Sequence, residues 1–131
     1  MFQVSKKSQY GLRAMVYIAR ASQKKEITSL KKISRAEGIP FDFLEKIVSK
    51  LEKAGLVKSK KGVQGGYLLA KPAKKITAGA IVKTLEGKIS PVGCSLCGKS
   101  KKCLSKNVWD KVKTSLVSTL NSITLYDLLK K

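Results

Sequence analysis

The region between residues 28 and 54 constrains the fold most, because two short amphipathic helices are joined there by a tight turn. Thr28 or Ser29 can cap the first helix, and Gly38 ends it. Pro40 suits the first turn of the second helix, since proline has a helical φ and no amide hydrogen to satisfy. The apolar positions expected to face inward are Leu30, Ile33 and Ala36 in the first helix and Phe41, Leu44, Ile47, Val48 and Leu51 in the second. This pattern predicts a helix-turn-helix, whose second helix normally lies in the major groove of DNA.

A β-hairpin is predicted directly after the second helix. Residues 56–60 and 67–70 have the composition of short strands, and the turn at 61–66 contains three glycines. No helix follows Gly66, which argues against a nucleotide-binding phosphate loop. The lysines of the hairpin, which can contact phosphates or enter the minor groove, are Lys58, Lys60 and Lys61. The hairpin is therefore predicted to be the wing of a winged helix-turn-helix.

The formal charge of +20, from 28 basic and 8 acidic residues, makes a polyanion the expected partner. Only three of the basic residues are arginines, so much of the affinity should be directed at phosphates and be sensitive to salt. A membrane partner is not expected, because the apolar run at residues 14–19 is too short to span or direct secretion. Double-stranded promoter DNA is the predicted partner, and the cytoplasm is the predicted location. A non-specific architectural DNA-binding protein is the alternative that the lysine excess allows.

The outward face of the second helix carries both acids and lysines. Asp42 and Glu45 can accept hydrogen bonds from cytosine amino groups, and Lys46 and Lys50 can reach phosphate or guanine. Taken alone, the same face fits an ordinary solvated helix with acids at its positive end. Together with the hairpin, it gives the candidate DNA-contacting residues Ser29, Phe41, Asp42, Glu45, Lys46, Ser49, Lys50, Lys58, Lys60, Lys61 and Gly65.

Further helices are predicted on either side of this region. Ser8 can cap one of them, and Thr77 can cap a short one that Gly87 ends. A long helix starts near Asn107, and Thr124 caps a last turn. The apolar stripe of the long helix consists of Val108, Trp109, Val112, Leu116 and Leu120. In a chain this small, such a stripe predicts that the helix crosses its counterpart in a symmetric homodimer.

The expected fold class is therefore mainly α with a small β-hairpin wing: a winged helix-turn-helix followed by a long C-terminal dimerisation helix. Residues 1–75 are expected to form the DNA-binding region, and residues 76–106 the linking helix and a cysteine loop. Residues 107–131 are expected to form the dimerisation helix and the C-terminal turn, all within one structural domain.

Three cysteines, Cys94, Cys97 and Cys103, lie within ten residues, which indicates a metal site or a redox switch. An iron-sulfur cluster, zinc and a metal-free thiol switch are all compatible with this spacing. An odd number of cysteines fits a reducing compartment. The chain has no histidine and no nucleophile at a suitable distance from a base, so neither an enzyme nor a small-molecule substrate is expected.

In this order, the motifs resemble the Rrf2 family of winged-helix transcriptional regulators. The segments that carry the resemblance are 5–6, 10–15, 39–45, 51–57, 65–70, 103–104 with Trp109, and 120–125. The resemblance implies a homodimeric repressor or activator that binds a near-palindromic promoter site and holds a cluster, with [2Fe-2S] preferred to [4Fe-4S], through the three cysteines. It also implies that Asp42 and Glu45 read bases, and that Lys61 stands where an arginine commonly enters the minor groove.

The sequence departs from the family pattern around the cluster. The first two cysteines are closer together than is usual, and Lys106 stands where a histidine ligand is often found. In other relatives an aspartate of the partner subunit is the ligand, and Gln9 stands at that position. The candidates for the fourth ligand are Gln9, Glu86, Asp110, a small thiol or water. An oxygen or exogenous ligand is favoured, and such a labile corner would suit redox sensing.

Overall fold

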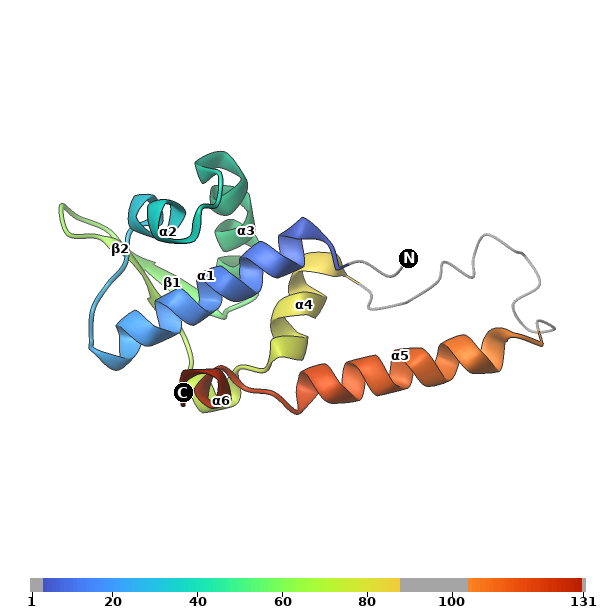
Figure 1. Cartoon of the computed structure of the whole chain (residues 1–131). Helices are drawn as coiled ribbons and strands as arrows, with labels where there is room; N and C mark the ends of the chain where they lie inside the picture. Colours follow the sequence, from blue (N-terminus) through green and yellow to red (C-terminus); the bar gives the residue numbers. More distant parts are fainter. Residues whose placement is uncertain (1–3, 88–103, 131) are drawn as a thin grey trace.

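The computed structural model describes residues 4–87 and 104–130. Its helices are α1 (Lys6–Gln23), α2 (Leu30–Glu37), α3 (Phe41–Lys53), α4 (Ala78–Glu86), α5 (Lys106–Asn121) and α6 (Leu125–Leu129). A two-stranded hairpin, β1 (Val57–Lys60) and β2 (Gly66–Leu69), and a short 3-10 helix, η1 (Ala73–Lys75), lie between α3 and α4. The hairpin extends from one side of the helical body, and α5 extends from the other (Figure 1). The prediction of a mainly α fold with a small hairpin is confirmed.

Side-chain caps fix where most of the helices begin. Thr77 and Thr124 cap α4 and α6 as predicted, and Ser29, one of the two candidates, caps α2. The prediction for α1 is wrong, because its cap is Ser5, whose side chain accepts a hydrogen bond from the amide of Ser8 at 3.3 Å. Ser8 is instead fully buried inside the helix, where its hydroxyl donates to Glu86 at 2.6 Å. The burial of Ser8 is therefore offset by a charged partner from α4.

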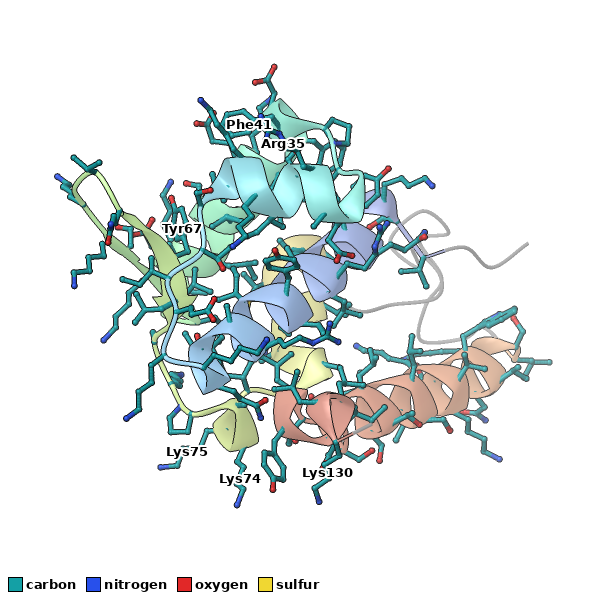
Figure 2. All side chains as sticks on the ribbon, turned by 60° about the vertical axis from the view of Figure 1, so that its left-hand side comes forward. Arg35, Phe41, Tyr67, Lys74, Lys75 and Lys130 are labelled. Carbon is teal, nitrogen blue, oxygen red and sulfur yellow. The ribbon has the colours of Figure 1, made fainter. Side chains whose placement is uncertain are left out.

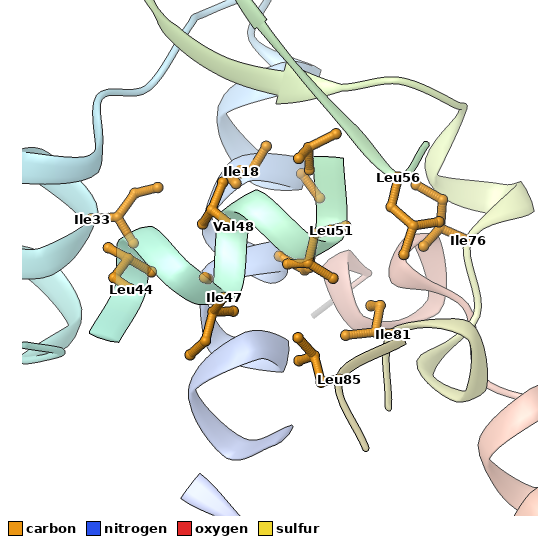
Figure 3. Packing of buried hydrophobic residues seen from close by; sticks show 14 of the residues in the cluster. Ile18, Ile33, Leu44, Ile47, Val48, Leu51, Leu56, Ile76, Ile81 and Leu85 are labelled. Atoms are coloured by element: carbon orange, nitrogen blue, oxygen red, sulfur yellow. The ribbon is translucent and has the colours of Figure 1, made fainter. Parts of the chain in front are cut away.

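The core forms where α3 packs against α1, α2 and α4 (Figure 3). Four inward positions of α3 are buried as predicted, and they are Leu44, Ile47, Val48 and Leu51. Two other predicted inward residues, Phe41 and Ala36, are exposed. They flank the turn between α2 and α3, where Ile33, Ile39 and Leu44 already fill the space beneath the two helices. The helical spacing predicted the correct buried face of α3, but it placed the first buried residue at Phe41, whereas burial begins at Leu44.

The segment that joins α1 to α2 pairs with the wing along the outer edge of β2. The hairpin is antiparallel, with Val57 opposite Leu69 and Lys60 opposite Gly66, so each strand begins one residue away from the predicted start. Thr28 and Tyr67 form a bridge, in which the Tyr67 amide donates to the Thr28 carbonyl at 2.7 Å. A side chain at Gly66 would lie 2.3 Å from that carbonyl oxygen. Glycine is therefore required where the wing meets the linker.

The long helix α5 has no buried residue. It begins at Lys106, close to the predicted start, and its end meets α4, where Gly79 leaves room for the side chain of Asn121. Exposed apolar side chains, of Val108, Val112 and Leu116, continue along it. An apolar stripe without a partner in its own chain is the expected form of an association surface. None of the described helices is both long and apolar enough to cross a membrane.

Candidate nucleic-acid interface

The outward face of α3 is one part of the candidate interface. Asp42, Glu45, Lys46 and Lys50 are exposed and follow one another at helical spacing, and Ser49 between them is half-buried. The two acids precede the two lysines along the helix. Such a face offers hydrogen-bond acceptors to base edges at one end and cations to phosphates at the other.

Phe41 stands at the first position of α3 and is 38% exposed. In Figure 2 it lies at the outer edge of the molecule. An exposed aromatic ring at the start of a helix-turn-helix recognition helix can contact the methyl group of a thymine. Its exposure agrees with its place among the candidate DNA contacts, and contradicts its predicted place in the core.

The lysines of the wing are exposed on β1 and at its tip. Lys58, Lys60 and Lys61 have no carboxylate within 4 Å among the described residues. Gly65 contributes through shape, because its amide already donates to the Gly62 carbonyl at 3.0 Å. A side chain at Gly65 would lie 2.3 Å from the Lys60 carbonyl, so glycine keeps the turn narrow.

The wing and α3 are joined near the end of the helix. Ser59 of β1 donates a hydrogen bond to the carboxylate of Glu52 at 2.9 Å. Tyr67 of β2 lies close by, and its pKa is raised by burial and then by the charges of Glu52 and Glu45. These contacts fix the direction of the wing relative to the exposed face of α3. Both parts can therefore meet one DNA duplex together.

A third part of the interface was missed by the sequence-based list. The start of α2 borders a hollow of about 460 Å³, lined by Tyr17, Ser29, Lys31, Lys32, Arg35 and Ala36. The hydroxyl of Ser29 accepts from the Lys32 amide at 3.2 Å, so it serves as a cap rather than as a free donor. Cations on the first helix of a helix-turn-helix are suited to the DNA backbone, which that helix crosses. The polar face of α2 was the signal that could have added Lys31, Lys32 and Arg35.

The predicted metal ligands Cys94, Cys97 and Cys103 lie outside the described residues. The three candidates for a fourth ligand are on different helices. The side-chain amide of Gln9 on α1 donates to the Val4 carbonyl at 2.7 Å, and Asp110 is exposed on α5. Glu86, at the end of α4, accepts hydrogen bonds from the hydroxyls of Ser5 and Ser8. Within residues 4–87 and 104–130, no three acids, cysteines or histidines gather into a metal site.

Glu86 connects the end of α4 to the start of α1. The hydrogen bonds from Ser5 and Ser8 lower the pKa of this carboxyl, and the charges of Lys7 and Lys50 lower it further. The carboxylate is therefore stabilised in its charged form. A proton or a metal ion on Glu86 would compete with two hydroxyl donors, which makes it the least available of the three candidate oxygen ligands.

A model of the Rrf2 family, described as an iron-dependent transcriptional regulator, matches residues 4–131. The HTH-type transcriptional regulator CymR of Bacillus subtilis is 38% identical over 125 residues, which are 95% of this chain and 88% of CymR. The HTH-type transcriptional regulator IscR of Vibrio atlanticus is 35% identical over 130 residues, which are 97% of this chain and 75% of IscR.

Solved structures give the same result. T. potens IscR superposes with a TM-score of 0.83 and 40% identity, covering 98% of this chain and 87% of that protein. B. subtilis CymR, described as the global cysteine regulator of that organism, superposes with a TM-score of 0.82 and covers 98% and 96% of the two chains. These relatives regulate transcription and are not enzymes, so the winged-helix fold and the absence of an enzymatic function are confirmed.

Replacing Glu86 with glutamine tests the link between α1 and α4. Because the folded state lowers the pKa of Glu86, its charged form contributes stability above the ordinary glutamate pKa. That contribution is lost as the pH falls through the lowered value. We expect Glu86→Gln to reduce the free energy of unfolding by about 0.5–1 kcal/mol at pH 7, since the group is largely solvated. The difference from the unsubstituted protein should disappear towards pH 3.

Urea unfolding at a fixed protein concentration, between pH 3 and pH 7, measures this effect. Glu26→Gln is the matched control, because it removes the same charge at an exposed position between α1 and α2. A loss of stability in Glu86→Gln that stays constant across this pH range would contradict the assignment.

Proposed function

The chain belongs to the Rrf2 family of transcriptional regulators, and from that premise we propose that it is a cytoplasmic, cluster-controlled regulator of promoters. It binds a near-palindromic DNA site as a homodimer, and an iron-sulfur cluster held by Cys94, Cys97 and Cys103 sets its affinity. The observation that carries the DNA-binding part is the joint presentation of α3 and the wing, fixed by the Ser59–Glu52 hydrogen bond.

Sequence recognition is assigned to the start of α3. Asp42 and Glu45 accept from cytosine amino groups, and Phe41 contacts a thymine methyl group. The other candidates supply phosphate contacts that position the protein, and they are Lys46, Ser49, Lys50, Lys58, Lys60 and Lys61. With one arginine on α2 and none on α3 or the wing, phosphate contacts dominate the affinity.

Dimerisation is assigned to α5. A second copy of the same helix, crossing the first, would bury its exposed apolar stripe. No other surface is needed, because a two-fold interface is formed by the same surface on both subunits. Such a dimer presents two recognition helices to successive major grooves on one side of the duplex. The operator is then a near-palindrome with half-sites about 34–36 Å apart.

The cysteines provide a donor set that suits a cluster. Thiolates are the usual ligands of iron-sulfur clusters, and three of them leave one corner for an oxygen or an exogenous ligand. When bound, a cluster supplies redox chemistry and sensitivity to oxidants. The residues of this chain hold it and transmit its state, and the cysteine segment follows α4, whose end is tied to α1 by Glu86. We prefer a [2Fe-2S] cluster, with Gln9 or Asp110 as the protein-derived candidates for the remaining ligand.

Thiol-based control is the second candidate. It is favoured by the similarity to B. subtilis CymR, described as a global cysteine regulator, at 38% identity. Cys94 and Cys97 are close enough in sequence to respond to oxidation without any metal. A zinc site with the same three thiolates is the remaining alternative.

Selection from random-sequence duplexes tests DNA recognition. We expect a near-palindromic site bound at least about 1,000-fold more tightly than random DNA at the same salt concentration. Glu45→Ala should relax the choice at one base pair of each half-site, at a cost of about 1–3 kcal/mol. Lys61→Ala should weaken selected and random DNA alike, and Lys111→Ala on α5 is the control. Equal affinity for selected and random DNA would rule out sequence-specific regulation.

The dimer is tested by placing a charge in the stripe of α5. Leu116→Glu should shift the protein from dimer to monomer in sedimentation velocity, because two buried carboxylates would face each other across the two-fold axis. Operator affinity should fall with it. Ser118→Glu carries the same charge on the other side of the helix and should remain dimeric. A dimer that survives Leu116→Glu would place the interface elsewhere.

The cluster is tested on protein purified without oxygen. We expect visible absorption, with iron and sulfide in equal amounts, and loss of both in Cys103→Ala. Gln9→Ala and Asp110→Ala should separate the two candidate ligands, since only the true ligand should change the spectrum. Colourless protein with one zinc per chain would replace the cluster with a zinc site. Protein that stays metal-free after anaerobic reconstitution would leave the thiol switch.

A further inference from the structure

A second cluster of lysines lies below the wing and takes no part in the interface described above. Three of its members, Lys71, Lys74 and Lys75, follow β2 along the chain, and the fourth, Lys130, follows α6. The two segments are adjacent because η1 packs against α6. Figure 2 shows Lys74, Lys75 and Lys130 projecting from the same edge of the molecule. We call these four residues the η1–α6 lysine surface.

An aromatic ring organises this surface. The ammonium groups of Lys74 and Lys130 lie 4.6 Å and 4.9 Å from the centre of the Tyr126 ring. Attraction to the ring offsets part of the repulsion between two like charges at one place. The neighbouring acid, Asp127, is hydrogen-bonded in the capping box of α6. Among the described residues, no carboxylate lies within 4 Å of any of the four lysines.

The position of the surface relative to the wing suggests its partner. In both overall views, η1 and α6 lie beyond the base of the wing, at the end opposite its tip (Figures 1 and 2). Lys71 lies two residues after the end of β2, so the surface begins where the chain leaves the base of the wing. A duplex held by α3 and the wing, and bent towards the protein beyond the wing, would meet this surface next.

We propose that the η1–α6 lysine surface binds the phosphates of DNA flanking the operator, beyond the base pairs that α3 and the wing contact. The inference rests on the proposed DNA-binding function and extends its footprint. Lysines are suited to this contact because they act as point charges towards phosphate and carry little base preference. The flanking contact therefore adds affinity and salt dependence without adding sequence specificity.

The test uses two duplexes with the same selected site. The short duplex ends at the base pairs contacted by the wing, and the long duplex continues for about one helical turn at one end only, so that it meets one subunit. Each is titrated by fluorescence anisotropy between 50 and 200 mM salt. Since each phosphate contact adds about 0.9 to the slope of log affinity against log salt, three contacts should make the slope for the long duplex steeper by about 2.7. Going from 200 to 50 mM salt should then favour the long duplex by a further factor of about 40.

The decisive variant replaces Lys74, Lys75 and Lys130 with glutamine. We expect it to remove the advantage of the long duplex and leave binding to the short duplex unchanged. The control variant replaces three other exposed lysines with glutamine and so removes the same charge. These are Lys83 on α4 and Lys111 and Lys113 on α5. Replacing the same three lysines of the surface with arginine keeps charge and ring contact, and should restore the steep slope.

Several results would overturn the inference. Equal slopes for the two duplexes in the unsubstituted protein would exclude the flanking contact, and so would an equal loss in the control variant. A failure of the arginine variant to restore the slope would exclude a contact made by charge. If the lysines increased binding only after a second, separate duplex was added, the surface would bridge two DNA molecules and would not bind DNA flanking the operator. Failure of the unsubstituted protein to prefer the selected site on either duplex would refute the proposed function itself, and the inference with it.

Discussion

The rotation of α3 about its own axis is the constraint on which the rest of the structure depends. Leu44, Val48 and Leu51 are completely buried against the neighbouring helices, and that burial fixes which side of the helix can face outward. A rotation by one residue, about 100°, would carry Glu45 towards the core, where an unpaired carboxylate is very costly. The hydrophobic core therefore determines the recognition face as firmly as it determines the fold.

The few acids of the chain connect elements more than they neutralise charge. With 28 basic and 8 acidic residues, general neutralisation is out of reach. Four acids instead join or cap particular elements: Glu37 pairs with Arg13, Glu52 with Ser59, Glu86 with Ser5 and Ser8, and Asp127 with Thr124. The excess of lysine is left on the surface, where self-repulsion lowers stability and a polyanion relieves it. The acids that remain at the start of α3, Asp42 and Glu45, are accordingly available to read bases.

Local patterns predicted the elements well, and tertiary contacts explain where the prediction failed. The caps at Thr77 and Thr124 depend on nearby backbone amides, so the local pattern predicted them, and it narrowed the cap of α2 to Thr28 or Ser29. The local pattern did not reveal that Ser8 is buried inside α1, where its hydroxyl donates to Glu86, a residue 78 positions further along the chain. The bridge between Thr28 and Tyr67 joins segments with no shared pattern. For the interface, the outward face of α3 and the wing lysines were predicted. The cations of α2 were missed because only the apolar residues of that helix were used in the prediction.

The candidate fourth ligands differ in what they would connect, and this determines how a signal at the cysteines could reach DNA. Gln9 belongs to α1, which packs against α3, so a Gln9 ligand acting across the dimer, as the family resemblance implies, would tie the cysteine segment of one subunit to the recognition helix of the other. Asp110 belongs to α5, and among the described elements only α4 makes extensive contact with that helix. A ligand from Asp110 would therefore tie the cysteine segment to the proposed dimer helix. Glu86 is already bound by two hydroxyls, and using it would break the link between α1 and α4. A ligand from α1 would therefore connect the cysteines of one subunit to the DNA-binding unit of the other, whereas a ligand from α5 would act through the proposed dimer helix.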